Sequence, residues 1–346
     1  MGGRALKNCE TRRYGKDEYF AILTEVQTLL KPYFPRTEAV AAYKNKEDFG
    51  DLDLLAESDK VNFDVVKMIK ILFDSKEVVP NGKVYSFEYK DFQIDLILTP
   101  RNEMEFARHY YAYNDLGNLM GRIAHKFGLK YGHDGLYYMF RDGTRLIGEI
   151  CVSMDIKHVF NVLDFNYTRW TKGFDDLEDI YEFVSRSKYF NPDIYLFDQM
   201  NHRSRVRDQK RSTYNGFLKW CDQMRVGEWE DQMFYTFSKN KDSNLVWLFD
   251  QFPGFKDQWI ELYHRKLEFQ DLRIKFNGDH VSAMTGLTGK ELGRFMQDFR
   301  HSYGNDEDFR IWLITSSQDV VDAAIVDHFE KSDFKPYKQP MVLWPK

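Results

Sequence analysis

Several features that define common classes of protein are missing from this sequence. Its 346 residues include three cysteines, Cys9, Cys151 and Cys221, which lie far apart and give neither a CxxC pair nor a disulfide framework. The nine histidines show no HxH, HExxH or Cys/His spacing, so a zinc site is not expected. The absence of GxSxG, P-loop and Rossmann fingerprints argues against hydrolase, ATPase and dehydrogenase functions.

Targeting and membrane signals are missing as well. The opening residues, MGGRALKNCE, lack the apolar core of a signal peptide, and no apolar run approaches the roughly 18–20 residues that cross a bilayer. We therefore expect a cytoplasmic protein without membrane partners. The net charge of −5 argues against nucleic-acid binding by overall charge, so such binding would need local basic patches.

The hydrophobic pattern predicts a mixed α/β front part and a mainly helical rear part, with a boundary near 150–155. Helical spacing is found at 17–32, 61–75, 104–128, 176–189, 194–225, 245–270 and 289–301. Strands are expected at 39–43, 52–56 and 83–100, the last as two strands joined at Lys90-Asp91, and a glycine-punctuated hairpin region at 129–150.

The stretch DFGDLDLLAES (48–58) places two aspartates inside an otherwise apolar strand. Strand side chains alternate, so Asp51 and Asp53 point to one face with Cα atoms roughly 7 Å apart. Two carboxylates this close repel each other, and a divalent cation removes that penalty. A neighbouring strand could bring Asp95, in FQIDLIL (92–98), to the same cluster. The alternative that Asp51 and Asp53 merely cap a strand edge stays open, because 54 acidic residues produce such pairs by chance.

Three carboxylates on adjacent strands suit a two-metal displacement at phosphorus. One metal lowers the pKa of an attacking hydroxyl, and the other holds a triphosphate and the leaving pyrophosphate. We therefore predict that Asp51, Asp53 and Asp95 form a metal-binding cluster of the magnesium type.

These residues resemble the nucleotidyltransferase superfamily, and within it the family X DNA polymerases related to DNA polymerase beta. YKNKEDFGDLDLL (43–55) resembles the family's basic-pair, glycine, Asp-x-Asp strand, and QIDLIL (93–98) resembles the strand with the third catalytic aspartate. YYAYNDLGNLMGRIAHKFGLKYGHDGLYY (110–138) is similar to the helix, lysine-glycine turn and hairpin of the polymerase thumb. Together the likeness covers roughly residues 17–140.

The resemblance implies an α+β fold with a nucleotidyltransferase palm and a mixed sheet, followed by a mainly helical domain. The implied segments are a palm at 1–105, a thumb-like nucleotide-binding segment at 106–152 and a helical domain at 153–346. The resemblance also implies that Asp51, Asp53 and Asp95 are catalytic and bind two Mg²⁺ ions, with Mn²⁺ as a substitute, and that the substrate is an NTP or dNTP. Asp95 would assist deprotonation of a 3′-hydroxyl. The implied nucleotide-binding residues are Lys44, Lys46, Gly50, Tyr110, Tyr111, Asn114, Asn118 and Arg122.

The sequence departs from the family pattern at three places. Val40-Ala41 stands where the family has Gly-Ser before the basic pair, and Tyr113-Asn114 stands at its second Gly-Ser. The hairpin's Asn-Glu-Tyr is here Gly132-His133-Asp134. These changes weaken the case for a processive, templated polymerase more than the case for metal chemistry.

A second likeness lies near the other end of the chain. FNGDHVSAMTGLTGKELGRFMQDFR (276–300) resembles the closing segment of CCA-adding tRNA nucleotidyltransferases and poly(A) polymerases. Gly286 and Gly289 permit a tight turn, and Thr288 can cap the helix that follows, whose N-terminus is either a phosphate site or simply a capped turn. The combined likeness favours tRNA or another RNA over DNA as acceptor.

Basic residues near these segments are candidates for nucleic-acid binding. HRSRVRDQKR (202–211) is the densest basic stretch, and it is either a patch that tracks a nucleic-acid backbone or a solvated helix face. The candidate residues are Lys126, Lys130, Arg141, Arg203, Arg205 and Arg207.

The leading hypothesis from the sequence is a nucleotidyltransferase that adds a nucleoside monophosphate to a nucleic-acid 3′-end, and two rivals stay open. One is an enzyme of the same fold that modifies a protein or a small molecule. The other is a non-catalytic nucleic-acid-binding module that kept the fold.

Overall fold

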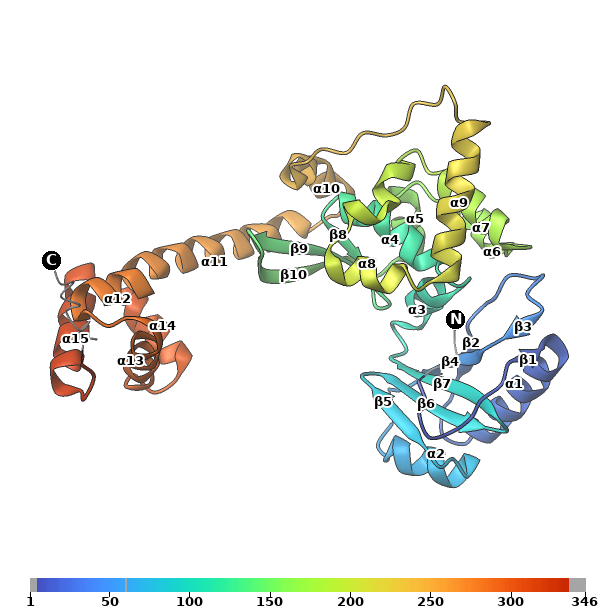
Figure 1. The fold of residues 1–346 in the computed structure, drawn as a ribbon, viewed down its shortest axis with the longest axis horizontal. Helices are drawn as coiled ribbons and strands as arrows, with labels where there is room; N and C mark the ends of the chain where they lie inside the picture. Colours follow the sequence, from blue (N-terminus) through green and yellow to red (C-terminus); the bar gives the residue numbers. More distant parts are fainter. Residues whose placement is uncertain (1–4, 60, 336–346) are drawn as a thin grey trace, which may run out of the picture. The chain divides into compact units, whose positions relative to one another are not determined.

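The computed structural model describes residues 5–59 and 61–335 (Figure 1). The described residues form two compact units: one within Met1–Met139 and Glu149–Phe255, the other within Phe140–Gly148 and Lys256–Lys346. This division differs from the segments expected at 1–105, 106–152 and 153–346, because residues 153–255 pack with the front of the chain. Within the described residues, no helix combines the length and apolar character needed to cross a bilayer.

A five-stranded mixed sheet forms the front of the first unit. Its order is β2 (Thr37–Ala39), β4 (Asp51–Glu57), β7 (Phe92–Thr99), β6 (Val84–Tyr89) and β5 (Val78–Asn81). β4 and β7 run parallel, and the other neighbouring strands pair antiparallel. The sheet and the helices after it confirm the α+β class. The strand expected at 39–43 ends at Ala39, although the Val40 amide still donates to the Asp53 carbonyl (3.0 Å).

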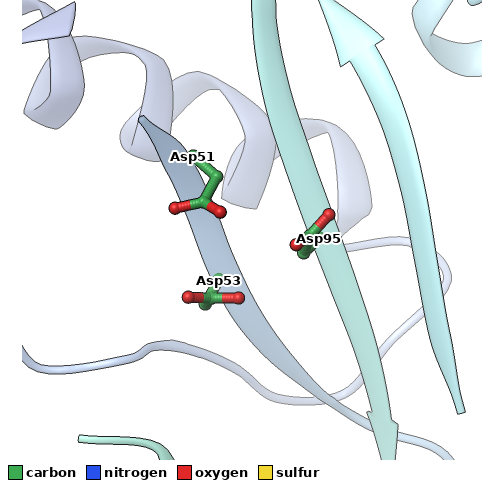
Figure 2. Close-up of side chains that lie close together, drawn as sticks. All are labelled: Asp51, Asp53 and Asp95. Carbon is green, nitrogen blue, oxygen red and sulfur yellow. The ribbon is translucent and has the colours of Figure 1, made fainter. Parts of the chain in front are cut away.

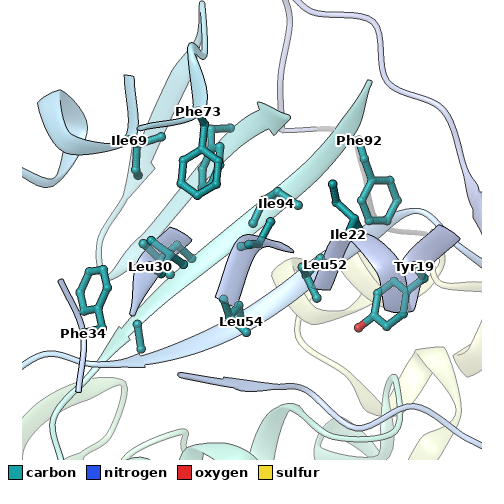
Figure 3. Close-up of a cluster of buried hydrophobic side chains, with 14 of the residues drawn as sticks. Tyr19, Ile22, Leu30, Phe34, Leu52, Leu54, Ile69, Phe73, Phe92 and Ile94 are labelled. Carbon is teal, nitrogen blue, oxygen red and sulfur yellow. The ribbon is translucent and has the colours of Figure 1, made fainter. Parts of the chain in front are cut away.

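One face of the sheet carries the main core. α1 (Lys16–Leu30) and α2 (Val65–Phe73) cover this face, where they bury residues such as Leu52 of β4 and Ile94 of β7 (Figure 3). Side chains alternate along a strand, so Asp51, Asp53 and Asp95 must lie on the opposite face.

That opposite face is covered over part of its length. Leu55 of β4 and Ile97 of β7 pack against Met104 and Ala107 of α3 (Met104–Tyr111). The three aspartates precede these residues on the same two strands, and the fold therefore leaves room beside them for a cleft.

The rest of the first unit is mainly helical. It contains β1 (Tyr14–Gly15) paired with β3 (Asp48–Phe49), and α4 (Leu116–Lys126). A three-stranded sheet follows α4 in the chain, in the order β10 (Arg145–Ser153), β9 (Leu136–Asp142) and β8 (Leu129–Tyr131), and residues 140–148 of its β9–β10 hairpin belong to the second unit. The helices after this sheet are α5 (Ile156–Val162), α6 (Tyr167–Thr171), α7 (Leu177–Ser185), α8 (His202–Asp208), α9 (Ser212–Val226) and α10 (Leu245–Gln251).

The helix predicted over 104–128 is interrupted between α3 and α4. Tyr113 and Asn114 both adopt left-handed backbone there, with φ of 57° and 58°. These are the positions of the family's second Gly-Ser, and glycine would occupy such a conformation without strain. The Tyr113 ring packs against Phe174 (centroids 4.8 Å apart), which holds the break in place.

The second unit is a helical bundle with its own core. α11 (Phe255–Lys275) leads into α12 (Gly278–Thr285), α13 (Gly289–His301), α14 (Asp306–Thr315) and α15 (Gln318–Lys331). Phe295, Phe299 and Val321 are among its buried residues. The helix predicted at 289–301 is confirmed, and Gly286 and Gly289 have positive φ as their turn requires, but the Thr288 side chain makes no capping bond.

Candidate active site

The three predicted aspartates lie together on the sheet. Asp53 stands opposite Asp95 in the parallel pairing of β4 and β7, and Asp51 is two residues earlier on β4. One carboxylate oxygen from each residue lies within 4.8 Å of the others (Figure 2). This arrangement confirms the prediction that a neighbouring strand places Asp95 beside Asp51 and Asp53.

Burial and mutual repulsion make it unfavourable for all three carboxyl groups of the triad to be ionised without a bound cation. Burial raises the pKa of Asp53 well above its ordinary value, the charges of Asp51 and Asp95 raise it further, and Lys46 opposes them. Burial also raises the pKa of Asp95 to about 6, although hydrogen bonds from Ser86 and Gln93 act in the opposite direction. The Gln93 amide donates to Asp95 Oδ1 at 2.9 Å.

The donor set fits a divalent cation of the magnesium type. Such an ion prefers carboxylate oxygens together with water and substrate phosphates, and it would offset the mutual repulsion of the partly buried acids. Asp51, Asp53 and Asp95 are the residues that could hold it.

A polar cleft of about 600 Å³ opens beside the triad within the first unit. Asp51, Asp53 and Lys46 line it from the sheet side. Its remaining lining residues are Arg13, Tyr43, Asp48 and Gly50 from the segments before and at the start of β4, and Asn114, Asp115, Leu177, Arg207, Lys210, Arg211, Ser212 and Thr213 from the helical part. The volume is in the range of small-molecule sites, and carboxylates beside several cations suit a polyanion that carries a metal ion.

Three of the predicted nucleotide-binding residues line this cleft. They are Lys46, Gly50 and Asn114. The Lys46 ammonium lies 4.6 Å from the centre of the Phe49 ring, and burial lowers the pKa of Lys46 while Asp51 and Asp53 raise it. Lys44, in contrast, is exposed, does not line the cleft, and pairs with Asp175 at 2.6 Å.

The other predicted nucleotide-binding residues, Tyr110, Tyr111, Asn118 and Arg122, do not line the cleft. Tyr110 and Tyr111 pack edge to face, with ring centroids 5.0 Å apart. Burial raises the pKa of Tyr111, and the neighbouring Tyr110 and the charge of Asp53 raise it further. Asn118 and Arg122 of α4 instead hydrogen bond to Asp208 at the end of α8.

The predicted nucleic-acid-binding residues fall in several places. Arg207 lines the cleft, whereas Arg203 and Arg205 are on the same helix, α8, outside the lining. Lys130 pairs with Glu149 at 3.1 Å. Lys126 is half-buried on α4, and burial, with help from Arg122, lowers its pKa. Arg141 belongs to the second unit and donates to the Thr144 carbonyl (3.0 Å).

Sequence reasoning missed several residues of the cleft. Arg13 and Asp48, which pair with each other, and Asp115 carried no motif signal. Lys210 and Arg211 belong to the basic stretch 202–211 that was predicted as a candidate patch, but neither was predicted individually as a binding residue. The sequence did contain one indication: Asp208 is the single acidic residue of that basic stretch, a position that favours ion pairs with the arginines around it.

A scan against models of protein families found no match to this chain, and a search of curated proteins found no significant match either. The likeness to nucleotidyltransferases therefore stays a prediction.

Proposed function

We propose that this protein is a metal-dependent nucleotidyltransferase, which transfers a nucleoside monophosphate from an NTP or dNTP to the 3′-end of a nucleic acid. The observation that carries the proposal is the group of Asp51, Asp53 and Asp95 on adjacent parallel strands, beside a cleft that also contains cationic side chains. An RNA acceptor such as tRNA is favoured over DNA by the likeness of residues 276–300.

The chemistry divides among the residues of the site. In this proposal Asp51, Asp53 and Asp95 would hold two Mg²⁺ or Mn²⁺ ions, which would supply charge stabilisation for the reacting phosphate. Asp95 takes the proton of the 3′-hydroxyl, with Gln93 fixing its carboxylate. The 3′-oxygen forms a bond to the α-phosphorus, the bond from that phosphorus to the oxygen bridging to the β-phosphate breaks, and pyrophosphate leaves.

Nucleotide incorporation tests the proposal directly. Labelled NTPs and dNTPs would be incubated with the protein, Mg²⁺, and either tRNA or a DNA primer. Asp53→Asn should reduce incorporation by roughly 100–1000-fold, because it weakens binding of the cations that stabilise the negatively charged transition state. Glu57→Gln is the matched control, since Glu57 lies on β4 but outside the triad. Incorporation that survives Asp53→Asn would refute the metal assignment.

The same assay separates the rival functions. Transfer of label to a protein or small molecule, with no need for nucleic acid, would identify the same-fold modifying enzyme. Nucleic-acid binding without magnesium-dependent turnover, unchanged in Asp51→Ala, would identify the non-catalytic module.

A further inference from the structure

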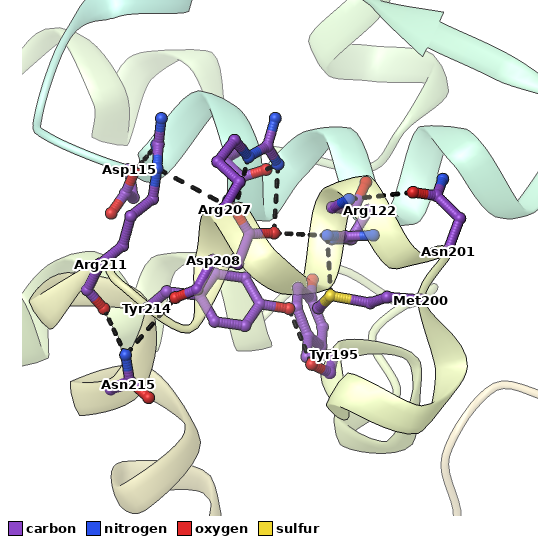
Figure 4. Close-up of polar contacts among 12 residues, drawn as sticks. Asp115, Arg122, Tyr195, Met200, Asn201, Arg207, Asp208, Arg211, Tyr214 and Asn215 are labelled. Carbon is purple, nitrogen blue, oxygen red and sulfur yellow. Dashed lines mark hydrogen bonds and ion pairs between the residues drawn. The ribbon is translucent and has the colours of Figure 1, made fainter.

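A fully buried carboxylate organises the helical side of the cleft. Asp208, at the end of α8, has 0% of its surface exposed. Arg207 and Arg122 both hydrogen bond to it, with Arg207 Nε 2.6 Å from Oδ1, and Arg211 Nε lies 4.0 Å from the same oxygen (Figure 4). A carboxylate removed from water is costly unless it is paired, so the arginines account for its presence there.

This cluster carries more positive than negative charge. Asp208 and Asp115 are its two acids, and Asp115 pairs with Arg211. Against them stand Arg122, Arg207 and Arg211, with Lys210 next to Arg211 in the chain. The Lys210 side chain has no ion pair among the described residues. Arg207, Lys210 and Arg211 line the cleft, so its helical side carries net positive charge, while Asp51 and Asp53 line its sheet side.

The contacts also fix how the arginines are presented. Arg207 uses Nε and Nη2 on Asp208, and Nη2 also donates to Asn118 Oδ1 at 2.7 Å. Arg211 uses Nη1 on Asp115. The side chain of Arg207 is 49% exposed and that of Arg211 is 41% exposed, and both line the cleft. One edge of each guanidinium is held and other donors are left for a ligand, which is a preorganised arrangement for an oxyanion.

The start of α9 adds to this environment. Arg211 is the N-cap of α9 and Ser212 and Thr213 begin the helix, and all three line the cleft. No side chain caps these first amides. The partial positive charge of a helix N-terminus therefore reinforces the basic side chains.

We propose that Arg207, Lys210 and Arg211 bind the polyphosphate of the nucleotide substrate, and that Asp208 is a positioning residue which sets the two arginines. The nucleotide part of this inference rests on the proposed function. A cleft that is also lined by Asp51 and Asp53 of the triad fits a short polyanion better than a nucleic-acid backbone, because Arg203 and Arg205, which would extend a backbone-tracking patch, do not line it.

Binding of inorganic tripolyphosphate in metal-free buffer, measured by calorimetry, tests the inference without turnover. Arg211→Gln should weaken binding about tenfold or more. The matched control is Lys219→Gln, which removes the same charge from an exposed position on α9 and should change little. Equal affinities of these two variants would overturn the proposal, as would a loss of tRNA affinity in Arg211→Gln without loss of tripolyphosphate affinity.

Asp208→Asn separates positioning from charge. This change adds net positive charge, so a simple charge effect would tighten tripolyphosphate binding, whereas loss of positioning should weaken it several-fold. Tighter binding would overturn the role of Asp208. If Asp208→Asn does not fold, Arg207→Lys is tested in its place. This variant keeps the charge but loses the paired contacts to Asp208 and Asn118, so its affinity for tripolyphosphate should fall. Its KM for the nucleotide should rise by a larger factor than its kcat falls.

The outcomes distinguish this inference from the proposed function. Tripolyphosphate binding that responds to the variants as expected, in a protein that transfers no nucleotide, would leave the polyphosphate site intact and refute the transferase. If the protein transfers nucleotides but Arg211→Gln and Arg207→Lys bind tripolyphosphate as tightly as the wild type, the transferase function stands and the polyphosphate site is refuted.

Discussion

Asp53 and Asp95 face each other across β4 and β7, and burial raises the pKa of both. A carboxyl group whose pKa is higher in the folded state binds more protons there than in the unfolded chain. For Asp95 this holds between its ordinary pKa near 3.8 and its folded value of about 6. Without metal, this group therefore lowers the free energy of unfolding as the pH rises through that window, and the loss is complete above it.

Asp95→Asn should consequently stabilise the metal-free protein at pH 7.5. The expected gain is up to about 3 kcal/mol, from a shift of roughly two pKa units, and it should shrink at pH 5. Urea denaturation in EDTA measures it. Addition of Mg²⁺ should stabilise the wild type more than the variant, and an Asp95→Asn protein that is less stable at pH 7.5 would contradict the prediction.

His109 gives a pH dependence of opposite sign. It is fully buried, its Nδ1 donates to the Glu105 carbonyl at 2.7 Å, and its ring stacks on Trp170 at 3.9 Å. Burial lowers the pKa of His109 to about 4, whereas the unfolded residue titrates near 6.5. Between these values the unfolded chain binds more protons, so His109 lowers stability as the pH falls from 6.5 towards 4.

His109→Phe keeps an aromatic ring at this position and removes the titration. Relative to the variant, the wild type should lose about 2 kcal/mol of unfolding free energy between pH 7 and pH 5. Parallel denaturant titrations at the two pH values give this difference. The same pH dependence in both proteins would show that the charge on His109 has no part in it.

At the scale of elements, α3 and α4 approach each other closely at their junction near the site. A Cβ added at Gly117 in the first turn of α4 would lie 2.3 Å from the Tyr110 carbonyl oxygen of α3. Backbone cannot move aside cheaply, so this glycine allows the close approach of the two helices. The break between them carries Asn114 into the cleft lining.

Gly117→Ala should therefore destabilise the protein, by roughly 1–3 kcal/mol as for other overpacked sites. Gly121→Ala on the same helix is the control. Its new Cβ would lie 3.7 Å from Tyr131 Cβ, an ordinary contact, and alanine should raise stability by up to about 1 kcal/mol. Thermal melting of both variants measures the contrast, and equal Tm values would contradict it.

The elements that could be predicted from sequence are those whose pattern is local. The alternation in 83–100 predicts β6 and β7 with their turn at Lys90-Asp91, and the same-face rule predicts that Asp51 and Asp53 point together. The pairing of β4 with β7 was a hypothesis about neighbouring strands, and the structure confirms it. The break at Tyr113 was missed, although Asn114 and Asp115 are typical turn residues, because the helical spacing of apolar residues continues across it; in the structure the Tyr113 ring packs against Phe174.

Only the sheet side of the cleft could be predicted from the sequence, because the helical side depends on contacts between distant segments. Its sheet side follows from the Asp-x-Asp strand, whereas its helical side depends on how α4, α8 and α9 pack around Asp208. Asp115 and Arg211 are ninety-six residues apart in the chain and meet only through that packing. Contacts of such separation leave no periodic signal in a single sequence.

At the scale of the whole molecule, each compact unit has its own core. Phe295 of α13 is fully buried in the second unit. Phe295→Ala should cost about 3–5 kcal/mol in that core and leave the aspartate triad unaffected. Amide hydrogen exchange should show faster exchange in α12–α15 and unchanged protection in β4 and β7. Comparable loss of protection in β4 and β7 would contradict the existence of separate cores.

The chain enters the second unit twice, first with residues 140–148 of the β9–β10 hairpin and again after Phe255. Phe140 packs against Trp259, and Gly148 lies close to Leu262. During translation the hairpin leaves the ribosome well before α11 is made, at about 5–20 residues per second. The nascent chain therefore exposes the Phe140 surface for several seconds, and this is where we expect chaperone binding or early aggregation to begin.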